Sequence, residues 1–599
     1  MGIEQLNRRL YSSRDFVADF LRYLTILNVT GALLLLTYRY GFALSGVESI
    51  ALLRGFDIIF TMFVVIYLVR VFYAFERAAF IRETWFECIL VSILSVGGLI
   101  KFVTGDRVLE ILLWTFNISQ SDRTYQLVIS LFILLLSSFE LTKASLQISN
   151  IQIKPATLFI ASFLLLISLG TGLLMLPNMT TAPGSMPFLD AFFTATSAAC
   201  VTGLIVVDTA TYFTLKGQWI IMGLIQLGGI GIVTFATFFA GLLTQQVGLK
   251  HQSIIREHLS SETLFEAKGL LRRVVTITLL IEFLGFVLIF LTWGEEVEFA
   301  SGRQKIFFSL FHSISAFCNA GFSLFSNGLY ELPVRNAYVL HVIIAGIIIL
   351  GGLGFNVIND LFSIRALRER LEKPWKDWTL GTKLALYVSL ALILVGTVLF
   401  MALERNHLLA DHALVPALIT SFFQSVTTRT AGFNTVDMAA LSEATVIMFL
   451  ALMFIGASPG STGGGIKTNT FFLITASALS TIRTRTAVEV AGRTIPSELL
   501  AKAFSVFAFG IAYNLLGIFL LTITERGKPL IAIMFEQVSA FATVGLSMGI
   551  TSSLSPLGKL IIISSMFIGR VGTITLALAV SSRVANSQYR YPTGYVMVG

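Results

Sequence analysis

Long apolar stretches alternate with short polar ones along most of the chain. Each apolar stretch is about 20 residues long, the length that a helix needs to cross the hydrocarbon core of a bilayer. Backbone polar groups find no water there, so such stretches fold as helices. The pattern predicts four spans in the first part of the chain (22–42, 56–73, 86–103, 125–142) and eight further on (157–177, 218–242, 274–293, 337–362, 381–403, 444–476, 502–523, 557–580).

The composition supports a membrane location. Of 599 residues, 55% are hydrophobic and 13% are charged, and the mean hydropathy is +0.83. A soluble chain this apolar would have too little polar surface to stay in solution. We therefore expect an all-α integral membrane protein. The polar N-terminus shows no short apolar core before a cleavage site, so no cleavable signal peptide is expected.

The net charge of +8 arises mainly in particular loops, which argues for a topology signal rather than nucleic-acid binding. By the positive-inside rule, these loops and both termini face the cytoplasm. The basic residues concerned are Arg8, Arg9, Arg14, Lys250, Arg256, Lys268, Arg272, Arg273, Arg365, Arg368, Arg370, Lys373, Lys376, Arg483, Arg485, Arg493, Lys502, Arg583 and Arg590.

One motif recurs four times without gaps. Each copy has a glycine ten positions after a phenylalanine, followed by Leu or Phe, and the glycines are 118, 111 and 113 residues apart. The copies are FTATSAACVTGLIVVD (193–208), FHSISAFCNAGFSLFS (311–326), FFQSVTTRTAGFNTVD (422–437) and FEQVSAFATVGLSMGI (535–550). Close helix packing explains an isolated membrane glycine, but four glycines in one register indicate an internal repeat.

A second glycine motif follows in each apolar span after the first: LGGIG (227–231), LGGLG (350–354), IGASPG (455–460) and IGRVG (568–572). Each repeat thus reads as a span (M1), a short pore helix and glycine turn (P), and a second span (M2). The predicted organisation is an N-terminal membrane region 1–150, then M1-P-M2 repeats at 151–245, 246–365, 366–480 (with an interrupted M2) and 481–599.

The segment between the two spans is too short to cross a bilayer, so it enters and returns beside protein or a water-filled cavity. The carbonyl end of its helix favours a cation, and the glycine permits an extended strand whose carbonyl oxygens face one axis. Four such strands replace the hydration shell of a cation, as potassium-channel filters do. The predicted filter comprises Val201, Thr202, Gly203, Leu204, Asn319, Ala320, Gly321, Phe322, Thr430, Ala431, Gly432, Phe433, Thr543, Val544, Gly545 and Leu546, with carbonyls of Thr202, Ala320, Ala431, Val544 and their neighbours holding K⁺.

Two aspartates, Asp208 and Asp437, stand five residues after a filter glycine. They lie on the side opposite the basic loops, where carboxylates concentrate cations at a pore mouth. An exposed loop aspartate is also often merely solvated, and both interpretations stay open.

These residues resemble the Ktr/Trk/HKT superfamily of potassium transporters. The likeness covers about 155–599; SAACVTGLIVVDT resembles the first filter of the Ktr-type membrane subunit, and YRYPTGYVMVG resembles its C-terminal tail. The resemblance implies a homodimer with one pore per protomer and a cytoplasmic RCK-type (KtrA/TrkA-like) regulatory subunit, on which alone a nucleotide (ATP/ADP or NAD) binds. It implies K⁺ as transported ion, with Na⁺ as an alternative; a glycine in all four filters goes with potassium preference.

The segment GASPGSTGGGIKT (456–468) is too rich in Gly, Ser and Pro to continue a helix through the third M2 span. It is similar to the gate loop of that superfamily, whose residues here are Gly456, Ser458, Gly460, Ser461, Thr462, Gly463, Gly464, Gly465 and Lys467. A Walker A motif is disfavoured, because Ile466 separates Gly465 from Lys467 and no strand precedes the segment. Arg570 interrupts the fourth M2 span; a membrane arginine is costly, and the resemblance implies a barrier or latch near the gate loop.

Residues 1–150 stand outside the repeat. The segment from Phe56 to Leu90 faintly resembles the second and third helices of voltage-sensor domains, but the fourth helix with an arginine at every third position is missing. We expect a packing or assembly module in the cell membrane, in contact with its lipids.

Other protein classes fit less well. The six histidines are scattered, no nucleophile-base pair or carboxylate cluster occurs in the spans, and Cys88, Cys200 and Cys318 give no metal or disulfide spacing, so no enzyme is expected. A secondary transporter with inverted repeats would alternate the orientation of its units, whereas these four share one direction. A cation-coupled symporter or a sodium/potassium-permeable member of the same superfamily stays open.

Overall fold

The computed structural model describes residues 3–74, 76–104, 155–243, 267–294, 297–375, 377–485 and 487–572. The chain divides into two compact units, Met1–Gln152 with Leu176–Asn178, and Ile153–Met175 with Met179–Gly599. We call these the N-terminal unit and the pore unit and describe each by itself. The domain boundaries inside the pore unit stay predictions.

The N-terminal unit is helical. It contains α1 (Ile3–Gly41), α2 (Gly46–Tyr73), α3 (Arg77–Glu83) and α4 (Trp85–Thr104). Ser45 and Glu48 form a capping box at the start of α2, which explains why that helix begins ten residues before the predicted span 56–73. A small core that includes Val29, Phe56 and Phe63 joins α1 to α2. The predicted span 125–142 lies outside the described residues.

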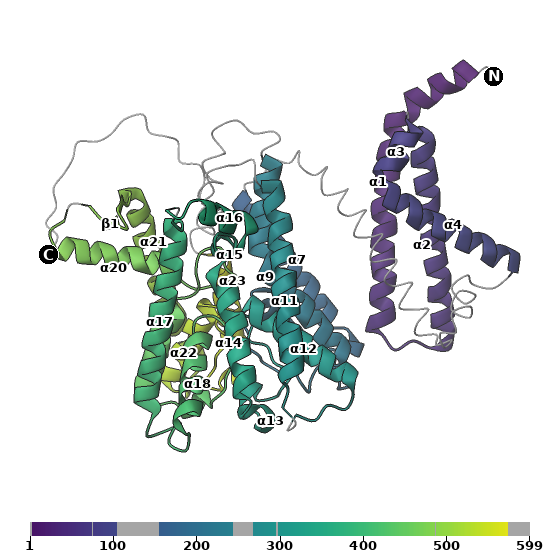
Figure 1. Cartoon of the computed structure of the whole chain (residues 1–599). Coiled ribbons are helices and arrows are strands. Elements are labelled where there is room, and N and C mark those ends of the chain that lie inside the picture. The colour runs from purple at the N-terminus through teal and green to yellow at the C-terminus, as the bar shows by residue number, and fades with distance from the viewer. Residues whose placement is uncertain are drawn as a thin grey trace. The chain divides into compact units, whose positions relative to one another are not determined.

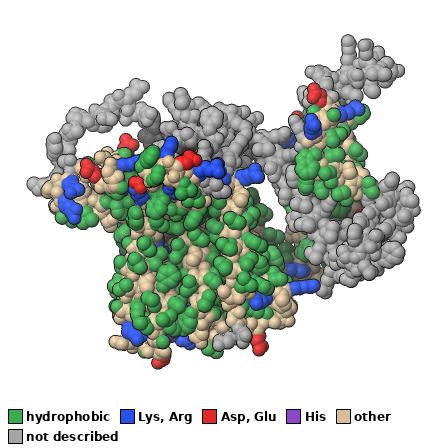
Figure 2. All heavy atoms as spheres, in the orientation of Figure 1, with side chains coloured by type: hydrophobic (Ala, Val, Ile, Leu, Met, Phe, Trp, Pro, Cys, Tyr) green, Lys and Arg blue, Asp and Glu red, His purple; other side chains and the backbone are tan. Residues whose placement is uncertain are grey.

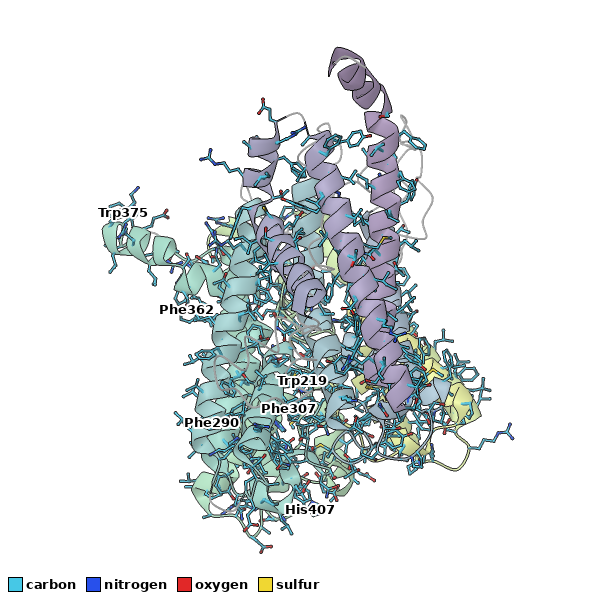
Figure 3. The ribbon with its side chains drawn as sticks, turned by 90° about the vertical axis from the view of Figure 1, so that its right-hand side faces the viewer. Trp219, Phe290, Phe307, Phe362, Trp375 and His407 are labelled. Atoms are coloured by element: carbon cyan, nitrogen blue, oxygen red, sulfur yellow. The ribbon has the colours of Figure 1, made fainter. Side chains whose placement is uncertain are left out.

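Repeats 1 and 2 form one half of the pore unit (Figure 1). Repeat 1 contains α7 (Pro155–Leu174), α8 (Phe188–Ala199) and α9 (Leu215–Leu243). Repeat 2 contains α11 (Ala267–Thr292), α12 (Gly302–Cys318), the short α13 (Leu332–Arg335), α14 (Tyr338–Leu353) and α15 (Phe355–Phe362). The rings of Trp219 from α9 and Phe307 from α12 lie 5.2 Å apart and pack the two repeats together (Figure 3).

Repeats 3 and 4 form the other half. After α16 (Ile364–Glu372), repeat 3 contains α17 (Leu380–Glu404), α18 (Leu414–Thr427), α19 (Glu443–Phe454) and α20 (Thr468–Ile482). A two-stranded hairpin of β1 (Glu489–Val490) and β2 (Arg493–Thr494) leads to repeat 4, which contains α21 (Ser497–Thr524), α22 (Leu530–Phe541) and α23 (Pro556–Val571). The short helices α8, α12, α18 and α22 are the pore helices.

The described residues include six helices that are long and apolar enough to cross a membrane, or seven if a bent pair counts as one span. On the visible face of the pore unit, hydrophobic side chains cover the middle and charged ones gather at its two ends (Figure 2). This distribution matches a hydrocarbon core between two wet interfaces. The helical membrane fold predicted from the sequence is confirmed.

The second M2 span differs from its prediction. The sequence pattern at 337–362 predicts one helix, but α14 and α15 meet at an angle of 103°. The break falls at Gly354, whose φ of 90° lies in the left-handed region, and a Cβ there would come within 3.0 Å of the Pro459 carbonyl oxygen. The helix therefore bends where the loop of repeat 3 approaches its backbone, a contact that periodicity does not encode.

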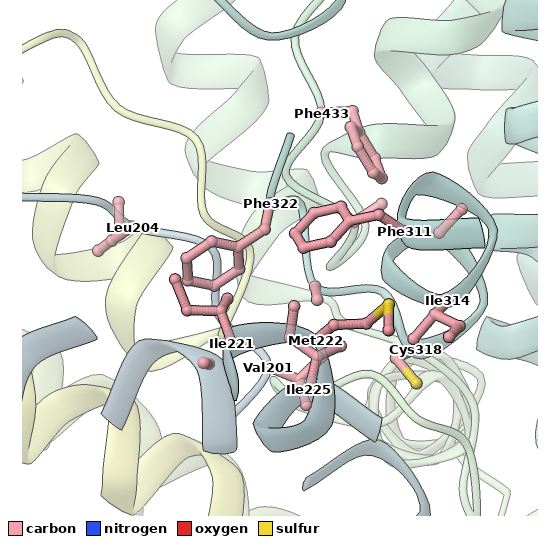
Figure 4. Packing of buried hydrophobic residues seen from close by; sticks show 14 of the residues in the cluster. Val201, Leu204, Ile221, Met222, Ile225, Phe311, Ile314, Cys318, Phe322 and Phe433 are labelled. Atoms are coloured by element: carbon pink, nitrogen blue, oxygen red, sulfur yellow. The ribbon is translucent and has the colours of Figure 1, made fainter. Parts of the chain in front are cut away.

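The pore helices are buried around the centre of the unit. Phe193, Phe311 and Phe535, from the repeated motif, are fully buried, whereas in repeat 3 the fully buried ring is Phe423 rather than the aligned Phe422. One buried apolar cluster draws on all four repeats and includes Val201, Ile221, Phe311 and Phe433 (Figure 4). This packing fixes the ends of the pore helices against the glycine turns that follow them.

Candidate functional site

Four glycines stand side by side at the centre of the pore unit. A Cβ on any of them would come within 3.0 Å of the carbonyl oxygen that precedes the glycine of another repeat. The pairs are Gly203 with Ala320, Gly321 with Ala431, Gly432 with Val544, and Gly545 with Thr202. The contacts run from repeat 1 to 2, 3, 4 and back to 1, so the four segments form a closed ring.

The ring has one backbone conformation in all four repeats. The residue two positions before each glycine has a positive φ: 56° at Val201, 60° at Asn319, 80° at Thr430 and 50° at Thr543. A non-glycine residue pays about 1–2 kcal/mol for this conformation, and such strain is concentrated at functional sites. Because the side chains at this position differ and the backbone does not, the repeats share a main-chain path.

Backbone hydrogen bonds fasten the ring to the pore helices. The backbone amide of the residue before each glycine donates to the backbone carbonyl of a serine or threonine in the last turns of the pore helix. The pairs are Thr202 to Ser197 (2.8 Å), Ala320 to Ser315 (2.7 Å), Ala431 to Thr427 (3.0 Å) and Val544 to Ser539 (2.8 Å). These bonds anchor each segment at the same residue whose own carbonyl oxygen lies against the neighbouring repeat.

The side-chain hydroxyls of these four serine and threonine residues also bond to the filter segment, in one of two ways. In repeats 1 and 4 the serine oxygen accepts from the amide of the filter glycine, Gly203 or Gly545, at 3.1 Å. In repeats 2 and 3 the hydroxyl donates to the carbonyl of the next residue, Phe322 at 2.8 Å or Phe433 at 2.7 Å. The ring therefore has two kinds of support despite its common path.

The second glycine motif marks where M2 meets the pore helix. A Cβ on Gly228, Gly351 or Gly569 would overlap a carbonyl oxygen at the end of the pore helix of the same repeat. The carbonyls belong to Ala199, Phe317 and Phe541, which occupy equivalent positions. In repeat 3 the corresponding Gly456 meets Gly464 instead. The loop that interrupts M2 there replaces the helix-to-helix contact.

That loop, between α19 and α20, lies against the ring. A Cβ on Gly463 or Gly464 would overlap the hydroxyl oxygen of Thr430 or Thr543, which are ring residues. The Thr462 hydroxyl donates to the carbonyls of Phe317 at 3.0 Å and Gly351 at 3.1 Å, in repeat 2. The loop is thus docked on one pore helix end and beside two filter strands.

The loop also closes on itself and on the bend of M2. The Gly456 amide donates to the Ile466 carbonyl at 2.9 Å, and the Lys467 ammonium donates to the Gly463 carbonyl at 2.6 Å. At the α14–α15 break, the Phe355 amide donates to the Gly460 carbonyl at 3.1 Å. Of the predicted gate residues, Gly465 has a φ of 67°, Ser458 is fully buried, and the buried Ser461 oxygen has no hydrogen-bond partner among the described residues.

Arg570 joins three repeats. It is only 3% exposed and lies near the end of α23 in repeat 4. Its guanidinium donates to the carbonyl of Thr462 in the loop and, at 2.6 Å, to the carbonyl of Gly228 in M2 of repeat 1. The structure therefore brings Arg570 and the loop together.

A second buried arginine, Arg429, lies three residues before the glycine of repeat 3. It is not among the site residues predicted from the sequence. It is 8% exposed, and its guanidinium donates to the carbonyl and hydroxyl of Ser389, each at 3.2 Å, and to the carbonyl of Gly456 at 3.3 Å. No salt bridge to it occurs among the described residues. Its position in the apolar M1-P-M2 pattern is the one signal that marks it, because a membrane arginine is rare.

The two predicted pore-mouth aspartates make local and inter-repeat bonds. Asp208 accepts from the amide of Ala210 at 2.9 Å and from the hydroxyl of Ser326, in repeat 2, at 2.6 Å. Asp437 caps a short turn by accepting from the Ala439 amide at 2.9 Å. Both carboxylates therefore have structural partners, and a role for them at a pore mouth stays a prediction.

A ring of four pore-loop segments inside a helical membrane unit defines a pore-loop transport protein. The family model of the TrkH cation transport proteins matches residues 126–589. The chain belongs to this family.

Two related proteins and one solved structure are consistent with this family. The chain is 39% identical over 451 residues to the Ktr system potassium uptake protein B of Bacillus subtilis, a match that covers 75% of this chain and 98% of the relative. It is 36% identical over 454 residues to the potassium/sodium uptake protein NtpJ of Enterococcus hirae, with the same coverage. The crystal structure of the potassium transporter TrkH from Vibrio parahaemolyticus matches 82% of this chain and 96% of its own, with a TM-score of 0.56 and 18% identity, which shows a shared fold.

Proposed function

We propose that this chain takes up potassium across the cell membrane through the closed ring. The single observation that carries the proposal is the set of contacts among the four glycine segments, in which the carbonyl before each glycine lies against the glycine of a neighbouring repeat. Carbonyl oxygens at such a centre replace the hydration shell of a monovalent cation. The ions are held by the carbonyls of Thr202, Ala320, Ala431, Val544 and their neighbours.

The loop 456–467 acts as a gate beneath the ring. Support comes from its contacts with Thr430 and Thr543 and from its ties to Phe317 and Arg570. Irregular backbone inside a membrane protein is tolerated where it lines a cavity. The cationic head of Arg570, fixed at this level, adds an electrostatic barrier to cation passage.

Assembly and orientation are part of the same proposal. The basic loops face the cytoplasm, as the positive-inside rule predicts. The resemblance to the Ktr/Trk/HKT superfamily implies a homodimer and a separate cytoplasmic regulatory subunit that carries the nucleotide, and both belong to the proposal. The role is transport rather than catalysis, and the chain itself needs no cofactor beyond its transported ion.

Sodium is the second candidate ion. One relative is named a potassium/sodium uptake protein and is 36% identical. The resemblance to the Ktr/Trk/HKT superfamily, in which a glycine in all four filters goes with potassium preference, favours potassium in this chain.

The test is cation flux in liposomes that contain the purified full-length chain. Uptake of rubidium or potassium down a gradient, with sodium far less effective as a competitor, is the expected result. A chain that moves neither ion, with or without a regulatory subunit, contradicts the proposal; equal use of sodium and potassium favours the second candidate.

A further inference from the structure

Behind the ring, three of the four pore helices carry a buried polar side chain that bonds to the strand leaving the filter glycine. We call these contacts the outer ties. They connect Glu536 with Ser547 and Thr551, His312 with Ser323, and Gln424 with Thr435. None of the three pore-helix side chains is exposed.

The tie of repeat 4 has the most polar contacts. One carboxyl oxygen of Glu536 accepts from the Ser547 hydroxyl at 2.7 Å, and the other accepts from the Thr551 hydroxyl. Ser547 is two residues beyond Gly545, and its oxygen also accepts from the Gly549 amide at 3.0 Å. The carboxyl group therefore holds the strand at two points just after it leaves the ring.

Repeat 2 has the same geometry with different chemistry. His312 stands at the position of Glu536 in the repeat, and Ser323 stands at that of Ser547. The Nδ1 atom of His312 lies 2.8 Å from the Phe308 carbonyl oxygen, which can only accept, so Nδ1 carries a hydrogen. In a neutral ring, Nε2 then accepts from the Ser323 hydroxyl, 3.1 Å away.

Repeats 3 and 1 complete the comparison. In repeat 3 the amide nitrogen of Gln424 donates to the Thr435 hydroxyl oxygen at 2.9 Å. In repeat 1 an apolar residue, Ile205, takes the place of the serine, and the strand is held further out by the bond of Asp208 to Ser326. Outer ties therefore occur in three of the four repeats, and repeat 1 has none among its described residues.

We propose that Glu536, His312 and Gln424 are positioning residues that set the potassium-over-sodium selectivity of the ring. The inference rests on the proposed function. A ring that keeps its size leaves the smaller sodium ion poorly coordinated, whereas a ring whose strands relax can close around it. The outer ties resist that relaxation because they are buried, and a broken buried bond leaves a polar group without a partner.

The experiment compares two serines of repeat 4 that each donate to a buried glutamate. Ser547→Ala removes an outer tie to Glu536, and Ser555→Ala removes a bond to Glu525 at the start of α23, away from the ring. Flux of K⁺ and Na⁺ is measured in liposomes with each full-length variant, and thermal unfolding is measured alongside. Glu536→Gln and its conservative partner Glu536→Asp form a second pair.

We expect the K⁺/Na⁺ flux ratio to fall about tenfold in Ser547→Ala and Glu536→Gln, to recover in part in Glu536→Asp, and to stay at the wild-type value in Ser555→Ala. An unchanged ratio in folded Ser547→Ala and Glu536→Gln overturns the inference, as does an equal fall in Ser555→Ala. A wild-type chain without potassium preference overturns the proposed function instead, so the two failures are distinguishable.

Discussion

At the residue scale, the site depends on where a side chain is absent or buried. The filter glycines leave no room for a Cβ beside the neighbouring carbonyls, and Arg429 and Arg570 replace hydration with carbonyl partners. Each of these features is a local departure from an apolar membrane helix. Their effects can be separated by single substitutions.

Gly203→Ser places a Cβ against the Ala320 carbonyl at a φ of 92°. The ring must widen or twist, at a cost of about 1–2 kcal/mol for the left-handed backbone alone, so the K⁺/Na⁺ flux ratio is expected to fall by about tenfold. Gly172→Ser in α7 is the matched control, because a Cβ there meets nothing within 4 Å. An unaltered ratio in Gly203→Ser would count against a backbone-lined ring.

Arg429→Met removes the donor that serves Ser389 and Gly456. The three acceptors are left in a buried place, so the free energy of unfolding is expected to fall by about 2–4 kcal/mol. Thermal unfolding in detergent measures the change. Arg429→Lys keeps the charge and should recover part of the loss; equal stability of all three proteins would show that the guanidinium bonds add nothing.

At the element scale, the interrupted M2 of repeat 3 and the bent M2 of repeat 2 pack directly against each other. The loop between α19 and α20 fills the place where the other repeats bring M2 against the pore helix, and the bend at Gly354 receives it. Hydrogen bonds from Thr462 and Arg570 hold this arrangement. Movement of the loop therefore requires a few defined bonds to break.

Thr462→Val keeps the shape of the side chain and deletes the hydroxyl that donates to Phe317 and Gly351. We expect the loop to leave the ring more readily and potassium flux to rise about two- to tenfold, as one lost hydrogen bond implies. Thr522→Val is the control, since that exposed hydroxyl bonds only within its own helix. A lower or equal flux in folded Thr462→Val would contradict a gating role.

A carboxylate at the end of M1 caps the start of M2 in repeats 3 and 4, through Glu404 to Ser442 and Glu525 to Ser555. For Glu525, outside the span, burial acts to raise the pKa, but bonds from Lys528 and Ser555 outweigh it and the pKa is lowered from 4.5. The contribution of ionised Glu525 to the free energy of unfolding is fully present above pH 4.5. It is lost as the pH falls through the lowered pKa of this group in the folded protein. The melting temperature should fall less on acidification in Glu525→Gln than in wild type; parallel curves would contradict this linkage.

The sequence predicted some elements better than others, for physical reasons. The helical membrane fold follows from local composition, and the glycines with positive φ recur because every repeat needs the same backbone. The bend at Gly354, the buried Arg429 and the tie from Glu536 to Ser547 depend on groups brought together by packing. No periodicity marks such contacts, and Phe423 in place of Phe422 shows that even an aligned register can shift by one position.

At the scale of the whole molecule, the pore unit closes a ring from four parts of a single chain. The outer surface is tied between repeats as well, by the ion pair of Lys559 with Asp190 and by the Asn434 amide that donates to the Asn327 carbonyl. Each repeat contributes one strand, the loop of repeat 3 contacts repeats 2, 3 and 4, and Arg570 of repeat 4 bonds to that loop and to repeat 1. One pore per chain is the arrangement that these contacts support.

The most direct test of this account is anomalous diffraction from crystals of the full-length chain grown in rubidium. We predict rubidium peaks on the axis of the ring, within coordination distance of the carbonyl oxygens of Thr202, Ala320, Ala431 and Val544. Rubidium bound elsewhere, with an empty ring axis at the same concentration, would contradict the claim that these carbonyls hold the transported ion.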